Sequence, residues 1–235
     1  MSNKIMLEEF LTLSEVLSQP RGLRKVVHSI SGWLSPNITT LIQKFGLQKS
    51  IINKNTDQLI LNIGCLRHSP QGTINTDIFP SIGMLLRSFR GKEKIEVDYY
   101  LNILYKDKNL IEKADGIFFS HVLEHLPPHL SLVALENLYS ILKPGGCLRI
   151  LVPSLENYFK DELPSTQGVS TPVIARNSVI YRHDHKFMYD QALLTTLLEH
   201  SGFRDIQLTE LHSGSLGHLD DPVNDGETLY LVCKK

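Results

Sequence analysis

The chain has 235 residues, 42% of them hydrophobic, and a formal net charge of −1 at pH 7. A chain of this length and composition buries a sizeable core without metals or disulfides, and its near-neutral charge gives no global bias toward nucleic acid. No apolar run is long enough to cross a bilayer, and Glu8 and Glu9 inside the first apolar stretch are not typical of a signal peptide.

Residues 1–56 are predicted to form a helical extension ahead of the main domain, residues 57–235. Apolar residues recur at helical spacing in three stretches, the first ending near Pro20, the second before Pro36 and the third at Gly46. These residues carry seven Lys or Arg against three Asp or Glu. The extension is therefore more basic than the rest of the chain.

The second of these helices, within residues 21–34, has a basic polar side. It is formed by Arg21, Arg24, Lys25 and His28. A basic amphipathic helix can lie on a membrane surface or meet a phosphorylated substrate. The simpler interpretation, which we favour, is a solvated face of a helix packed on the main domain.

The main domain is predicted to begin with a buried strand that runs directly into a glycine turn, residues 62–65. Glycine in this position lets the backbone approach a ligand closely. A second short strand ends in Asp77, whose carboxylate can accept hydrogen bonds from ribose hydroxyls or cap a turn. A third strand, or a strand followed by a turn, is expected over residues 95–104, which include Asn102.

A strand–helix–strand unit is predicted over residues 116–153. Two buried strands, 116–120 and 147–152, enclose a helix over residues 131–142 whose apolar residues recur at i, i+3, i+4 and i+7. Parallel sheets of this kind bind ligands at the carboxyl ends of their strands. The loop that follows the first strand, residues 121–129, is therefore predicted to lie at the binding edge.

The remainder of the chain supplies two more strands. Residues 157–182 show no sustained periodicity, so we expect a long loop of the kind that is usually a lid, a binding loop or disordered. Asp190 is predicted to cap a helix that ends at Gly202. Strands over residues 203–208 and 228–233 then bring the total to seven. The pattern predicts an α/β fold with a doubly wound, mostly parallel sheet.

Six pieces in this order resemble the class I S-adenosylmethionine-dependent methyltransferases. The closest likeness is to the methyltransferase type 11 group, which is associated with cell-surface polysaccharide synthesis. The pieces are LNIGC, INTD, SHVLEHL, LKPGGCLRILVP, HKFMYDQALLTTLLEHSGF and GETLYLVCKK. The likeness covers about residues 58–235. It implies a Rossmann-like sheet whose last strand inserts antiparallel beside the sixth.

The resemblance also implies a site for S-adenosylmethionine along the strand ends. Carried over position by position, Asn62, Ile63, Gly64 and Cys65 would form the loop under the methionine part, Asp77 would hold the ribose hydroxyls, Asn102 would lie near adenine, and Ser120 and His121 would line the cavity beside the transferred methyl. One position departs from the family, because Leu66 stands where a second glycine is usual.

Methyl transfer to a hydroxyl requires alignment of the acceptor and removal of its proton. A neutral histidine or a carboxylate within hydrogen-bond reach is the expected base. His121 is the first candidate, followed by Glu124, His125 and His185. In the simpler alternative, Glu124 and His125 only tie the loop to neighbouring backbone.

The string from His121 to His125 also matches the H-x-x-E-H pattern of inverted zinc peptidases. Pro127 and Pro128 follow at once, so the long ligand helix of those enzymes is not expected. Some methyltransferases of this fold hold a divalent metal in this same loop, and His183 or His185 is available here to complete a His, Glu, His set. Because no fourth ligand is identified, we predict no metal from the sequence.

We therefore expect a cytoplasmic S-adenosylmethionine-dependent methyltransferase that acts on oxygen of a saccharide or sugar-linked acceptor. Three cysteines, odd in number and far apart, are typical of reduced core thiols. The expected partner is a small-molecule or glycan acceptor, with no nucleic acid. The alternative is a non-catalytic binding or scaffold domain in glycan assembly that has lost the cofactor, motivated by Leu66 and by the basic helices.

Overall fold

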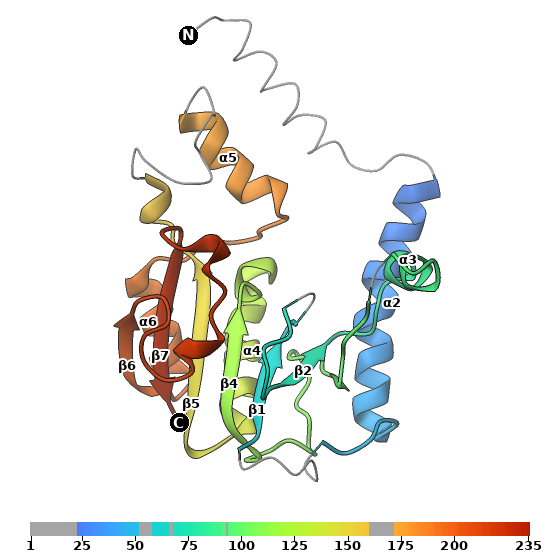
Figure 1. Ribbon diagram of the computed structural model, residues 1–235, viewed down its shortest axis with the longest axis horizontal. Helices are drawn as coiled ribbons and strands as arrows, with labels where there is room; N and C mark the ends of the chain where they lie inside the picture. The colour runs from blue at the N-terminus through green and yellow to red at the C-terminus, as the bar shows by residue number, and fades with distance from the viewer. Residues whose placement is uncertain (1–22, 52–57, 66–67, 93, 160–171) are drawn as a thin grey trace, which may run out of the picture.

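The computed structural model describes residues 23–51, 58–65, 68–92, 94–159 and 172–235. In this part of the chain one sheet is formed by β1 (Ile60–Ile63), β2 (Ile74–Asp77), β3 (Tyr99–Tyr100), β4 (Ala114–Ser120), β5 (Leu142–Pro153), β6 (Arg204–Thr209) and β7 (Thr228–Lys234). The strand order is β3-β2-β1-β4-β5-β7-β6 (Figure 1).

Only β7 runs against the other strands of this sheet, pairing antiparallel with both β5 and β6. The predicted seven-stranded, mostly parallel sheet with an inserted antiparallel last strand is therefore confirmed. The third strand is much shorter than the predicted 95–104, since only Tyr99 and Tyr100 pair with β2.

Two helices, α4 (Pro128–Ile141) and α6 (Gln191–His200), cover one face of the sheet (Figure 1). Side chains alternate along β4, and Phe119 points into the larger hydrophobic core together with Leu138 of α4 and Leu198 of α6. All three are fully buried. This packing fixes the direction of β4 and hence the place where its carboxyl end emerges.

The opposite face over β4, β5 and β7 is covered by residues 210–227, which connect β6 to β7. Phe118 of β4 packs there with Leu219. Arg149 of β5 is fully buried and forms an ion pair with Asp220, while it also donates hydrogen bonds to two backbone carbonyl oxygens of the same segment. The described part of the β1–β2 connection forms turns and no helix, so a loop rather than a helix closes this core.

The helix α2 (Leu23–Phe45) continues through Pro36, so the predicted break before Pro36 is wrong. Proline removes one backbone hydrogen bond from a helix. Here the Thr40 hydroxyl donates to the Pro36 carbonyl oxygen, and the Asn37 amide donates to that of Trp33. Neither bond replaces the one that Pro36 removes, which would go to the carbonyl oxygen of Gly32, so we infer that contacts of α2 with other segments stabilise the continuous helix.

The side of α2 that faces the main domain is polar. It carries four buried residues at a spacing of four, Ser31, Ser35, Thr39 and Gln43. The helix lies beside β3 and α3 (Ile82–Phe89) at one edge of the sheet (Figure 1). Its apolar residues Leu41 and Phe45 are instead exposed. The predicted helix that ends near Pro20 lies outside the described residues.

Residues 172–182 form the helix α5 (Pro172–Arg182), where the sequence pattern predicts a loop. The helix lies beyond the carboxyl end of β5 (Figure 1). Val179 packs against Tyr158 and Met188, which come from other segments. Such tertiary contacts stabilise a short helix that has little apolar periodicity of its own. Among the described helices, none is long and apolar enough to cross a membrane.

Candidate functional site

The glycine turn at the end of β1 has the sharp geometry that its sequence predicts. Gly64 has a φ of +69°, and the N–H groups of Gly64 and Cys65 both donate to the Thr76 carbonyl oxygen of β2, at 2.8 and 3.0 Å. A Cβ on Gly64 would overlap the side chain of Val122, which follows β4. Glycine is therefore required both by the backbone conformation and by the close packing of the neighbouring loop.

The other predicted residues of this turn have buried side chains. Asn62, Ile63 and Cys65 expose 2%, 3% and 2% of their surface. The Asn62 amide donates to the His68 carbonyl oxygen at 2.7 Å, which closes the turn. These side chains hold the turn in place, so a ligand would meet it mainly through Gly64 and the backbone.

Asp77 ends β2 beside this turn and is partly exposed. Its Oδ1 accepts a hydrogen bond from the N–H of Ile78 at 2.7 Å, which orients the carboxylate. Burial, followed by the negative charge of Asp77, raises the pKa of the Cys65 thiol to about 12, so the thiol stays protonated at neutral pH. Leu66 lies outside the described residues.

Asn102 forms hydrogen bonds with residues of α2. Its side-chain amide donates to the Thr40 hydroxyl at 2.9 Å, and its backbone N–H donates to Gln43 Oε1 at 2.9 Å. These contacts give Asn102 a role in holding the helix against the sheet edge. Its contact with adenine stays a prediction.

Ser120 and His121 lie where β4 ends. His121 has a φ of +53°, a left-handed conformation that is uncommon outside glycine and clusters at functional sites. Its Nδ1 lies 3.3 Å from Glu124 Oε1, and its Nε2 lies 3.2 Å from the Thr228 hydroxyl of β7. The His121 side chain is 27% exposed, so it borders both the interior and the binding edge.

The structure brings three of the four predicted catalytic residues into one compact cluster with the fourth beside them. Glu124 and His125 belong to a single 3-10 turn, Leu123–His125, so the helix of a zinc peptidase does not form here. His185 joins them from a segment about sixty residues later, because the N–H groups of Lys186 and Phe187 donate to the Glu124 carbonyl oxygen at 2.7 and 3.2 Å. The Glu124 side chain is fully buried.

The electrostatics of this cluster favour neutral imidazole at His185. Burial lowers the pKa of His185 to about 4, against a smaller opposing effect of the Glu124 carboxylate. The ring of His185 contacts that of His125 edge-on, with 4.9 Å between the ring centroids, and stacks on the ring of His183, with 5.6 Å between the centroids. At neutral pH His185 therefore offers a nitrogen lone pair rather than a positive charge.

Two neighbours of the site are not among the residues predicted for it, although both lie in segments that carry the family resemblance. Val122 fills the space above Gly64, and Thr228 faces His121 from a strand more than one hundred residues later. Only the sheet order, which places β7 next to β5, brings Thr228 within reach.

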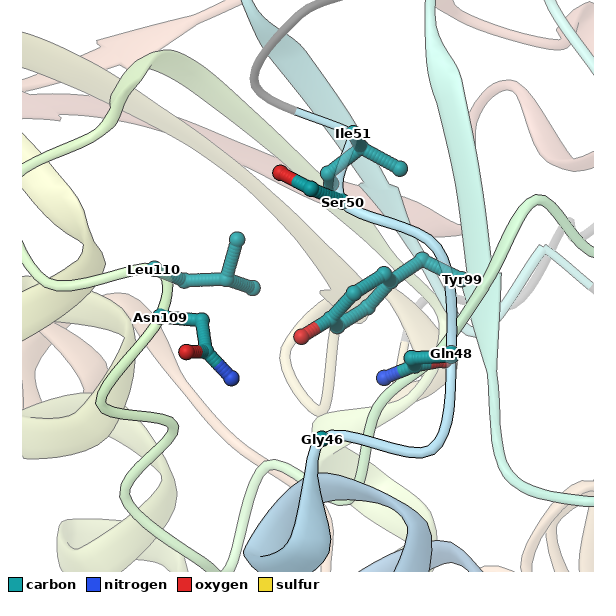
Figure 2. A pocket seen from close by; sticks show the side chains of 7 residues that line it. All are labelled: Gly46, Gln48, Ser50, Ile51, Tyr99, Asn109 and Leu110. Atoms are coloured by element: carbon teal, nitrogen blue, oxygen red, sulfur yellow. The ribbon is translucent and has the colours of Figure 1, made fainter.

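A separate pocket lies near the end of α2 (Figure 2). It is lined by Gly46, Gln48, Ser50, Ile51, Tyr99, Asn109 and Leu110. Asn109 and Leu110 precede β4, so the pocket lies away from the carboxyl end of that strand. None of the predicted site residues lines it.

Gly64, Asp77, Ser120 and His121 are partly exposed at the ends of β1, β2 and β4, which are neighbours in the sheet. These residues match what a nucleoside with an amino-acid tail requires. The carboxylate of Asp77 can accept hydrogen bonds from hydroxyls, the glycine turn leaves room near the backbone, and Ser120 and His121 provide polar side chains beside it. The residues present therefore fit S-adenosylmethionine.

Comparison with protein families gives one match over most of the chain. The family described as "Methyltransferase domain" matches residues 20–208. This match includes α2, β1 to β5 and all of β6 except its last residue. No curated protein matches the chain.

The solved structures that match the chain include several methyltransferases at low identity. A SAM dependent methyltransferase from Archaeoglobus fulgidus is 18% identical, with a TM-score of 0.49, over 85% of this chain and 93% of its own. An S-adenosylmethionine dependent methyltransferase from Mesorhizobium loti is 14% identical, with a TM-score of 0.46, over 77% and 92%. Phosphoethanolamine N-methyltransferase 2 from Haemonchus contortus is 14% identical, with a TM-score of 0.47, over 85% and 52%.

Proposed function

Because the chain belongs to the methyltransferase-domain family, we propose that it transfers a methyl group from S-adenosylmethionine to an oxygen atom of a saccharide or sugar-linked acceptor. The observation that carries this proposal is the line of Gly64, Asp77 and His121 along three adjacent strand ends. The acceptor class is supported by the resemblance of the sequence to the type 11 group. We place the reaction in the cytoplasm, in keeping with three free cysteines.

The residues at the ends of β1 and β2 hold the cofactor in this proposal. Asp77 would accept hydrogen bonds from the ribose hydroxyls, and the turn at Gly64 would hold the methionine part. Bound S-adenosylmethionine supplies an electrophilic methyl group on a sulfonium. The protein's main task is therefore to bind and orient the acceptor and to exclude water.

His121 is the proposed base for the acceptor hydroxyl. It is the partly exposed member of a histidine–carboxylate pair, with Glu124 buried behind it at 3.3 Å. The carboxylate stabilises the imidazolium that forms when His121 takes up a proton. Because Glu124 is fully buried, it acts through His121 as a positioning residue.

Isothermal titration calorimetry with S-adenosylmethionine and S-adenosylhomocysteine tests the cofactor site. We expect saturable binding, and we expect Asp77→Ala to weaken it at least tenfold, about 1.4 kcal/mol, through lost ribose hydrogen bonds. Glu136→Ala, which removes an exposed acid on α4, is the control and should bind normally. No heat at millimolar cofactor would favour the scaffold alternative, and unchanged affinity in Asp77→Ala would remove Asp77 from the site.

Turnover measurements test the base and the acceptor. With a panel of sugar nucleotides and oligosaccharides, His121→Ala should lower the rate of methyl transfer while cofactor affinity stays near that of the wild type. An unchanged rate would exclude His121 as the base. Transfer to amines but to no sugar hydroxyl would contradict the acceptor class.

A further inference from the structure

A buried carboxylate without a hydrogen-bond partner lies just beyond β4. The Glu124 side chain is 0% exposed, and neither of its oxygens accepts a hydrogen bond from the described residues. His121 Nδ1 is 3.3 Å from Oε1 but is not oriented to donate to it. Among the described residues, the ion-pair partners of Glu124 are histidines, with no Lys or Arg. A buried carboxylate in this state is strongly unfavourable unless a cation joins it.

Two imidazoles point at the same place. One nitrogen of His125, one nitrogen of His185 and one oxygen of Glu124 all lie within 4.8 Å of one another. His185 Nδ1 is itself buried and has no hydrogen-bond partner among the described residues. Two side chains from distant parts of the chain, each with an unsatisfied polar atom, therefore meet in one cluster.

The backbone holds these groups together without help from a ligand. The Glu124 carbonyl oxygen accepts from the N–H groups of Lys186 and Phe187, the two residues after His185. The N–H of His185 donates to the Ile180 carbonyl oxygen at the end of α5, at 3.1 Å. The arrangement is thus fixed from two sides by main-chain hydrogen bonds, as a preformed site requires.

We propose that Glu124, His125 and His185 bind one divalent transition-metal ion. Two imidazole nitrogens and one carboxylate suit zinc, iron(II), manganese(II) or cobalt(II), whereas magnesium and calcium prefer all-oxygen sites. Ligand atoms around a tetrahedral ion with bonds of about 2.0–2.1 Å lie roughly 3.3 Å apart, so small side-chain rotations complete the shell. His125 is 42% exposed, which leaves further coordination positions open toward solvent.

Metal titration of the chelator-treated full chain, with no cofactor or acceptor present, tests this site. We expect one ion per chain by calorimetry with zinc and manganese, and visible absorption bands with cobalt. Glu124→Gln should weaken binding at least tenfold, as loss of a ligand does. His129→Ala is the matched control, since it removes an exposed histidine of the same stretch, and it should bind like the wild type.

Thermal unfolding gives a second and independent readout. In metal-free protein, Glu124→Gln should raise the midpoint, because it removes a buried charge that accepts no hydrogen bond from the described residues, and it should abolish the rise that metal causes in the wild type. No saturable binding up to millimolar metal would overturn the proposal, as would equal binding by the wild type, Glu124→Gln and His185→Ala. These measurements do not depend on methyl transfer, so either proposal can fail without the other.

Discussion

Gly64 connects the end of β1 to the loop of the neighbouring strand. Its positive φ turns the chain out of the sheet, and the space that a Cβ would need is filled by Val122. His121, the residue just before Val122, also has a positive φ although it is not a glycine. Two left-handed residues at adjacent strand ends therefore shape the binding edge.

The Gly64→Ala substitution should separate backbone strain from packing when it is compared with Gly72→Ala. Gly72 also has a positive φ, of +82°, but nothing lies within 4 Å of its missing Cβ. Strain alone should cost about 1–2 kcal/mol at either position. Gly64→Ala should cost about 1–3 kcal/mol more, because Val122 must move. Urea denaturation measures both, and equal losses would show that Val122 gives way freely.

At the scale of elements, residues 210–227 cover one face of the sheet, where a helix would otherwise lie. Arg149 satisfies its guanidinium within this segment, with Nε donating to Asp220 Oδ1 at 2.6 Å and further bonds to Thr209, Glu210 and Ser213. Both members of the ion pair are fully buried. The pair thus fixes how the segment lies on the sheet, while its net contribution to stability depends on keeping both partners.

Asp220→Asn should destabilise the protein by about 3–5 kcal/mol, because it leaves the buried Arg149 charge uncompensated. Asp225→Asn, in the same segment but exposed, should stay within about 0.5 kcal/mol of the wild type. Chemical denaturation followed by circular dichroism gives both values. A loss below 1 kcal/mol for Asp220→Asn would mean that water or another group replaces the carboxylate.

At the scale of the whole molecule, α2 is joined to the main domain by polar contacts. Gln43 donates to Asp107 Oδ2 at 3.1 Å and accepts from the Asn102 N–H, while the Thr39 hydroxyl accepts from the Phe79 N–H at 2.7 Å. The chain around β3 is mostly irregular, and its backbone groups have few strand partners. The polar side of α2 supplies hydrogen-bond partners for these backbone groups. The boundary between residues 56 and 57 stays a prediction.

Gln43→Ala tests whether α2 and the sheet unfold together. If they form one cooperative unit, this substitution should lower global stability by about 1–3 kcal/mol in a single transition. The reason is that it leaves the buried polar groups that bond to Gln43 without a hydrogen-bond partner. Leu41→Ala, on the exposed side of the same helix, should change stability by less than about 0.5 kcal/mol. A normal main transition with a separate early one in Gln43→Ala would mark α2 as an independent extension.

The sequence located elements well where the signal is local. Apolar runs identified the strands β1, β4, β5 and β7, and Asp190 caps α6 by accepting from the Leu193 N–H as its position predicts. The apolar periodicity of α2 located the helix but not its buried side. Leu41 belongs to the apolar pattern, yet its side chain is 50% exposed. Helix α5 could not be predicted from the apolar pattern of the sequence, because it is stabilised by contacts from Tyr158 and Met188.

By itself, then, the sequence determined the strand–helix order, the glycine turn at Gly64 and the loop that carries His121, Glu124 and His125. Spacing along one segment encodes such features, because neighbours in the chain decide them. The sequence left open whether His183 or His185 meets Glu124, and only the tertiary structure decided for His185 and placed Thr228 opposite His121. These pairs depend on sheet order and on main-chain bonds between distant segments, which no local pattern of residues records.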